Sequence, residues 1–161
     1  MNRDADIRKV LEAVTDPEIP VISIEELGIL REIVQEENSI IIFISPTYSG
    51  CPAMDIIAFD IKKAMAEKGY QNVEVKYQLS PAWTTDDISD VGREKLKNYG
   101  IAPPEKLMPN ENGLFQNEKN PSCPRCNSEN TKLISLFGST PCKSLHQCLD
   151  CQEPFDRFKC H

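Results

Sequence analysis

The alternation of apolar and polar residues predicts a helix and two strands at the start of the chain. Apolar residues spaced three and four apart indicate an amphipathic helix that stops before Pro17, namely Ile7, Val10, Leu11 and Val14. Strands are expected over residues 28–35 and 40–44, on either side of a polar turn. The second strand is a continuous run of Ile and Phe, so it should be the central strand of its sheet.

The period then changes to that of a longer helix. Pro52 is suited to its first position and Gly69 to its C-terminal cap, and one face of the helix is apolar, with Met54, Ile57, Ile61 and Met65. Residues 73–79 alternate as a third strand, and residues 86–99 form a last helix. The pattern predicts an α+β domain with a small three-stranded mixed sheet.

A different organisation begins after Gly100. Residues 101–121 are rich in Pro, Asn and Glu and are expected to be a linker. Two Cys-x-x-Cys pairs follow, Cys123 with Cys126 and Cys148 with Cys151, separated by a segment long enough for two strands, over residues 133–137 and 143–147. We therefore expect three parts: an α+β domain over residues 1–100, a linker over 101–121 and a small β zinc ribbon over 122–161.

Composition and charge restrict the class of partner. The chain has 161 residues, 40% hydrophobic and 27% charged, as in a globular protein. Residues 1–120 carry 13 Lys and Arg against 21 Asp and Glu, and residues 121–161 carry 5 against 4. Because such a surface repels phosphate backbones, we expect no nucleic-acid partner. We also expect no membrane partner and a cytoplasmic location, since no apolar run approaches spanning length and no export signal is seen.

The seven cysteines are expected to be metal ligands and free thiols rather than a disulfide framework. A site of four thiolates suits zinc or iron, and zinc is the better default. Cysteines and histidines beyond the two pairs are either bystanders or ligands of a second, labile site, and the first interpretation is favoured for Cys142 and His146. The others in this group are Cys160 and His161.

Cys51 is the most interesting residue of the first domain. If Pro52 starts the helix, Cys51 is its N-cap, where free N–H groups and the helix dipole favour a thiolate that could act as a nucleophile or metal ligand. The alternative is a small capping residue with no chemistry. Residues 1–120 contain no His, so a Cys-His mechanism would lack its base.

Other polar residues are weaker candidates. Asp16 and Glu18 flank Pro17, where two carboxylates could bind a hard cation or orient a thiol, although a turn in which Asp16 holds its own backbone is the favoured interpretation. Thr47 could hydrogen-bond a bound cluster or only its own loop. Trp83 is more typical of a core or lid aromatic than of a binding platform.

Several spaced motifs resemble the MIP18 family, formerly the domain of unknown function 59. They are Asp16-Pro17-Glu18, Leu27-Gly28, Ser49-Gly50-Cys51-Pro52 and Trp83-Thr84-Thr85, with Glu26 where the family has Asp. One branch of that family acts beside the multicomponent phenylacetyl-CoA 1,2-epoxidase of aerobic phenylacetate degradation. The chain resembles this branch in the longer sequence around Cys51 and in the segments at 100–104, 137–140 and 153–159. The match extends over nearly the whole chain; Asn127 stands where Gly is usual, and Asn adopts the same backbone conformation.

The resemblance implies a role in the maturation of iron-sulfur or iron centres. It places Cys51 at the position of the family's cluster-handling cysteine, with Asp16, Glu18 and Thr47 as neighbours. Iron or a cluster would be transient, and zinc would be structural. The implied partners are proteins: epoxidase reductase or oxygenase subunits and the iron-sulfur assembly machinery.

We therefore expect an accessory protein that has no catalytic residues. The second hypothesis is a structural or electron-transfer subunit of the epoxidase itself, with iron held by the ribbon cysteines. A third, weaker one is a thiol enzyme that uses Cys51.

Overall fold

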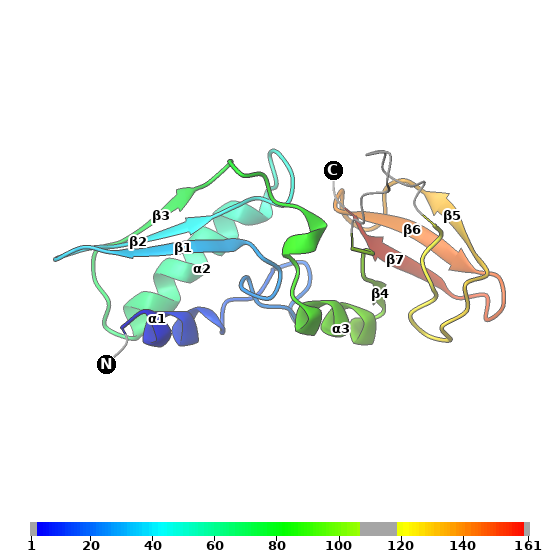
Figure 1. Cartoon of the computed structure of the whole chain (residues 1–161), viewed down its shortest axis with the longest axis horizontal. Helices are drawn as coiled ribbons and strands as arrows, with labels where there is room; N and C mark the ends of the chain where they lie inside the picture. Colours follow the sequence, from blue (N-terminus) through cyan, green and yellow to red (C-terminus); the bar gives the residue numbers. More distant parts are fainter. Residues whose placement is uncertain (1–2, 107–118, 160–161) are drawn as a thin grey trace. The chain divides into compact units, whose positions relative to one another are not determined.

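The computed structural model describes residues 3–106 and 119–159, and the chain divides into two compact units, residues 1–92 and 93–161 (Figure 1). The first unit contains α1 (Arg3–Leu11), β1 (Leu30–Gln35), β2 (Ile40–Ile44), α2 (Ala53–Glu67), β3 (Val73–Tyr77), the short 3₁₀ helix η1 (Thr85–Asp87) and the start of α3 (Asp90–Tyr99). No helix in these described ranges is both long and apolar enough to cross a membrane.

The sheet of the first unit has the order β1-β2-β3. β1 is antiparallel to β2, with Ile33 opposite Ile42, and β2 is parallel to β3, with Ile42 opposite Val75. The three-stranded mixed sheet and the central place of the Ile-rich strand are thus confirmed. α2 connects the two parallel strands and packs against β3 and α1, as a crossover helix does. The apolar face predicted for α2 is buried, at Met54, Ile57, Ile61 and Met65.

Some element boundaries differ from the predictions, either because a glycine forms a turn or because a side chain binds the backbone. β1 begins at Leu30, because Gly28 lies in a turn with φ +77°. The single helix predicted over residues 86–99 is instead η1 and α3. The Asp87 carboxylate accepts the Thr84 N–H at 2.8 Å, which closes η1, and Ser89 Oγ accepts the Gly92 N–H at 3.0 Å, which starts α3.

The second unit is built on a four-stranded sheet of order β4-β7-β6-β5. Its strands are β4 (Ile101–Ala102), β5 (Thr131–Ser135), β6 (Lys143–Cys148) and β7 (Pro154–Phe158). The expectation of a linker beginning at Ile101 needs correction, because β4 pairs in parallel with β7 and Ala102 joins the ribbon core. The middle of that segment, residues 107–118, lies outside the described residues.

The two strands predicted for the ribbon are present with shifted ends, and β7 adds a strand that the sequence pattern did not predict. Phe155 and Phe158 belong to β7 and are buried. Phe155 lies in one core cluster with Ala102, Cys123 and Cys148. Half of the cysteine cluster therefore belongs to the hydrophobic core of its unit.

Candidate metal centre

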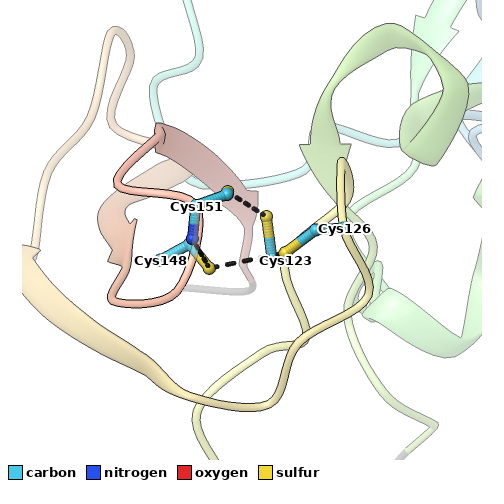
Figure 2. Close-up of side chains that lie close together, drawn as sticks. All are labelled: Cys123, Cys126, Cys148 and Cys151. Carbon is cyan, nitrogen blue, oxygen red and sulfur yellow. Dashed lines mark hydrogen bonds between the residues drawn. The ribbon is translucent and has the colours of Figure 1, made fainter.

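The four paired cysteines come together at one end of the ribbon (Figure 2). Residues 123–126 form the first knuckle, and residues 148–151 form the second knuckle at the end of β6. All four Sγ atoms lie within 4.8 Å of one another. Cys123 and Cys148 are buried, whereas Cys126 and Cys151 are exposed, so one side of the cluster faces solvent.

The sulfur separations match those of a tetrahedral metal site. Cys123 Sγ lies 3.7 Å from Cys151 Sγ, and Cys126 Sγ lies 3.6 Å from Cys148 Sγ. A zinc ion bound by four thiolates at about 2.3 Å requires sulfurs about 3.8 Å apart. The observed distances are far longer than the roughly 2.05 Å of a disulfide bond. The residues present fit a four-thiolate metal ion, and the same geometry is available to iron.

Backbone geometry positions each knuckle. The Asn127 N–H donates to the Cys123 carbonyl at 2.9 Å, and Asn127 has φ +61°, so the left-handed conformation predicted for it is confirmed. Gln152, the residue after the second knuckle, has φ +65°. No sequence signal indicated this second left-handed residue, since Gln has no preference for that conformation.

Hydrogen bonds to sulfur favour the thiolate form. The Cys151 N–H donates to Cys148 Sγ at 3.5 Å (Figure 2). This backbone donor lowers the pKa of Cys148 to about 7, so about half of the Cys148 thiols are ionised at neutral pH. A cation that arrives at the cluster therefore displaces the proton of this thiol more easily than that of an ordinary cysteine.

Asp150, in the second knuckle, binds the segment that follows the first knuckle, a role that sequence reasoning missed. Its carboxylate accepts hydrogen bonds from Ser128 Oγ and, at 2.9 Å, from Asn130 Nδ2. The Ser128 hydroxyl, followed by the Asn130 amide, lowers the pKa of Asp150. The polar residues Ser128, Asn130 and Asp150 were visible in the sequence, but nothing in their spacing indicated that they meet.

The remaining ribbon candidates lie inside the fold. Cys142 is buried, with its Sγ 3.0 Å from Thr140 Oγ1. His146 is buried too, hydrogen-bonded through Nε2 to Ser144 Oγ at 3.0 Å and stacked on Phe155. Both side chains therefore make contacts within the ribbon, and their structural role stays a prediction. The other two candidates, Cys160 and His161, lie outside the described residues.

Cys51 lies in the loop between β2 and α2 and is half-buried. The predicted cap is off by one residue: Pro52 is the N-cap and α2 begins at Ala53. Cys51 still joins the helix start, because its carbonyl accepts the Met54 N–H at 3.3 Å while its own N–H donates to the Tyr48 carbonyl at 3.3 Å. The loop is thereby pinned on both sides of the thiol.

The other candidates of the first unit lie in a turn, in a loop and in the core. Asp16 is buried, and its Oδ1 accepts the N–H groups of Glu18 at 2.8 Å and Ile19 at 2.9 Å. Asp16 Oδ1 therefore binds the backbone of its own turn, as the turn interpretation predicts. Glu18 is half-buried in the same turn, and Thr47 is buried in the loop that precedes α2. Trp83 is a core residue that donates to the Leu27 carbonyl at 2.9 Å.

The structure brings some predicted residues together and not others. In residues 3–106 and 119–159, the ribbon cysteines are the one group of three or more Cys, His, Asp or Glu side chains placed to hold a metal ion. Cys51, Asp16 and Glu18 do not form such a group. A centre handled at Cys51 would therefore need ligands from a partner or from the cargo itself.

Comparison with known proteins places both units in one family. Residues 4–77 match the model of an iron-sulfur cluster assembly protein, and residues 108–159 match the PaaD zinc beta ribbon domain. The chain is 44% identical over 160 residues to an Escherichia coli protein described as a putative subunit of 1,2-phenylacetyl-CoA epoxidase, with 96% of this chain and 92% of that protein covered.

Two further relatives match the first unit. A Porphyromonas gingivalis Fe-S protein maturation auxiliary factor is 30% identical, over 56% of this chain and 87% of its own length. The crystal structure of a domain of unknown function 59 from Bacillus anthracis superposes with a TM-score of 0.54 at 28% identity, over 57% of this chain and 89% of that one. The chain therefore belongs to the PaaD branch of the MIP18 family, in which an iron-sulfur cluster assembly domain is joined to a zinc ribbon.

Proposed function

We propose that this protein is a non-catalytic maturation factor for the iron-sulfur or iron centres of the multicomponent phenylacetyl-CoA 1,2-epoxidase. The observation that carries the proposal is the position of Cys51, a half-buried thiol in a pinned loop at the start of α2, within the segment that matches an iron-sulfur cluster assembly protein. The relative named as an epoxidase subunit supports the choice of client. The reductase or oxygenase subunits would receive the centre.

In this proposal Cys51 supplies a thiolate ligand to iron or a cluster that is cargo. Asp16 shapes the neighbouring turn, while Glu18 and Thr47 remain candidates for contact with the cargo. The missing ligands would come from the donor or client protein, so the cluster is released when the client's ligands replace Cys51. This arrangement suits transfer better than storage, because a single protein ligand is displaced easily.

The ribbon holds zinc in this proposal and has a structural role. Four thiolates with Cys123 and Cys148 in the core make the ion part of the fold. The second candidate function, a structural or electron-transfer subunit of the epoxidase, rests on the same four sulfurs, since they would equally hold a redox-active iron. The two candidates differ in which metal occupies the ribbon of the active protein.

Complementation tests the proposal. In cells that lack the protein, Cys51→Ser is expected to be produced at the normal level but to leave epoxidase activity unrestored. Cys142→Ser is the matched control, because it removes a thiol outside both sites and keeps a polar atom beside Thr140. Full activity with Cys51→Ser would contradict the proposal and leave Cys51 only a structural residue of the loop before α2.

A further inference from the structure

The outer strand of the ribbon carries an exposed apolar surface. β5 is an edge of its sheet, and no strand of the described residues pairs with its outer side. Four large apolar side chains here are 47 to 63% exposed. We call them the β5 edge surface: Leu133, Ile134, Leu136 and Phe137.

Such an edge is normally protected. Edge strands avoid pairing with other chains by means of charges, prolines, bulges or a covering segment. β5 has one charged residue, Lys132, and an irregularity between Leu133 and Ser135. Because side chains on both faces of the strand are apolar and exposed, this protection is weak. An uncovered surface of this kind is typical of a site for another polypeptide.

The charges around this surface identify its partner. From Thr131 to Leu149 the chain contains no Asp or Glu, although the whole chain has 25, and of the two lysines in this segment Lys132 is exposed and Lys143 is buried. The Asp156 carboxylate, which accepts a hydrogen bond from Ser139 Oγ, borders the far end of the segment. Lys159 adds a cation, with its Nζ 4.5 Å from the centroid of the Phe137 ring and donating to the Leu136 carbonyl. A strongly acidic protein thus presents a segment free of acidic groups at its open strand edge. Negative charge on a partner would be attracted here.

We propose that the β5 edge surface binds an extended segment of a client protein in which apolar and acidic side chains alternate. The segment adds a strand beside β5 through main-chain hydrogen bonds. Its apolar side chains cover Leu133 on one face of the sheet, and its carboxylates approach Lys132 on the other face. The identity of the partner as a client rests on the proposed function, whereas the surface itself does not.

A second apolar surface is less suited to this role and serves as a comparison. Ile56 and Phe59 on α2 are exposed to a similar degree. Acidic and basic side chains both border them, since Asp55, Asp60 and Lys63 lie on the same helix. Charge therefore selects no partner for the α2 surface.

The experiment uses the full-length, zinc-loaded protein labelled with ¹⁵N and two synthetic ten-residue peptides. One peptide alternates Ile and Val with Glu and Asp, and the other has Lys at every charged position. The acidic peptide is expected to shift amide resonances of β5 and to bind at least about tenfold more tightly than the basic one. Lys132→Glu should reverse this preference. Leu133→Thr with Ile134→Thr, which keeps residues that favour strands, should weaken binding about tenfold or more.

The control variant is Ile56→Gln with Phe59→Gln, which should bind like the natural protein. The inference is overturned if neither peptide shifts β5, if both bind equally, or if the α2 variant alone loses binding. It is also overturned if β5 resonances shift with protein concentration in the absence of peptide, because the occupant would then be a second copy. If the acidic peptide binds but Cys51→Ser restores epoxidase activity, the proposed function fails and the inference about the β5 edge surface stands. If the peptide does not bind but epoxidase activity requires Cys51, the inference about the surface fails and the proposed function stands.

Discussion

The Sγ atoms of Cys126 and Cys148 lie 3.6 Å apart, although the two residues belong to different knuckles of the ribbon. This contact and its counterpart between Cys123 and Cys151 join the two ends of the β5–β6 hairpin. A metal ion at their centre replaces a core that so small a unit can barely form from side chains alone.

Replacement of one ribbon cysteine should unfold the second unit. In Cys126→Ser or Cys148→Ser, three thiolates remain, and the loss of metal affinity is a loss of folding free energy. We expect the metal content to fall well below one per chain and the ribbon resonances to collapse, while those of the first unit persist. Cys142→Ser is the control and should retain its metal. A Cys148→Ser protein with full metal content and an unchanged melting temperature would show that the ligand set is wrong.

Metal retention should depend on pH in a defined direction. The Cys151 N–H lowers the pKa of Cys148 to about 7, so a fall in pH through 7 protonates the thiol that ionises most easily. Protons compete with the metal for every ligand, and zinc affinity should therefore decrease as pH decreases from 8 to 6. A competition titration with a zinc-binding dye measures this trend. Affinity that stays constant over this range would contradict it.

Gly28 in the Leu27-Gly28 motif should be essential for the fold. It has φ +77°, and a Cβ there would lie 2.4 Å from the Asp87 carbonyl oxygen. Gly69→Ala is a matched control, because Gly69 has φ +84° with no atom within 4 Å of the added Cβ. We expect the control to lose about 1 kcal/mol of unfolding free energy from backbone strain, and Gly28→Ala to lose at least about 2 kcal/mol. Chemical denaturation would measure both, and equal losses would contradict the packing argument.

Asp16 should show a structural role that is separable from any role in cluster handling. Asp16→Ala removes the acceptor of two N–H bonds and should cost about 1–2 kcal/mol of unfolding free energy. Asp16→Asn keeps a side-chain oxygen and should restore most of this stability. If Asp16→Asn is stable yet cannot support the epoxidase, the charge itself contributes to function. An Asn variant as unstable as the Ala variant would show that the turn does not depend on this acceptor.

The features that could be predicted from the sequence are those that depend on periodicity and on short-range spacing. The Ile-rich central strand, the buried face of α2 and the two knuckles follow from patterns within a few residues. β4 and β7 could not be predicted, because β4 is two residues long and pairs with a strand more than fifty residues away. The break between η1 and α3 depends on the Asp87 side chain, which turns back to cap Thr84 and also binds Arg31. Whether a side chain binds a local or a distant partner has no effect on the spacing of apolar residues, so the sequence pattern does not reveal it.

Among the candidate sites, too, the residues set by short-range spacing were predicted, and those brought together by the fold were not. The ribbon ligands were found because ligand spacing is a direct consequence of tetrahedral geometry. Asp150 was missed because its partners, Ser128 and Asn130, are adjacent only after the hairpin forms. For Cys51 the residue pattern predicted the start of a helix within one residue, but Cys51 belongs to no group of three or more potential metal ligands among the described residues.

The metal content of the active protein decides whether the ribbon holds zinc while Cys51 handles iron. The protein is purified anaerobically from cells with a working epoxidase, as the natural chain and as Cys51→Ser, and is examined by elemental analysis and visible absorption. We expect one zinc per chain in both proteins, together with substoichiometric iron absorption that is present in the natural chain and absent from the variant. Stoichiometric iron bound by Cys123, Cys126, Cys148 and Cys151 in the active form, unaffected by Cys51→Ser, would contradict this assignment of the two sites.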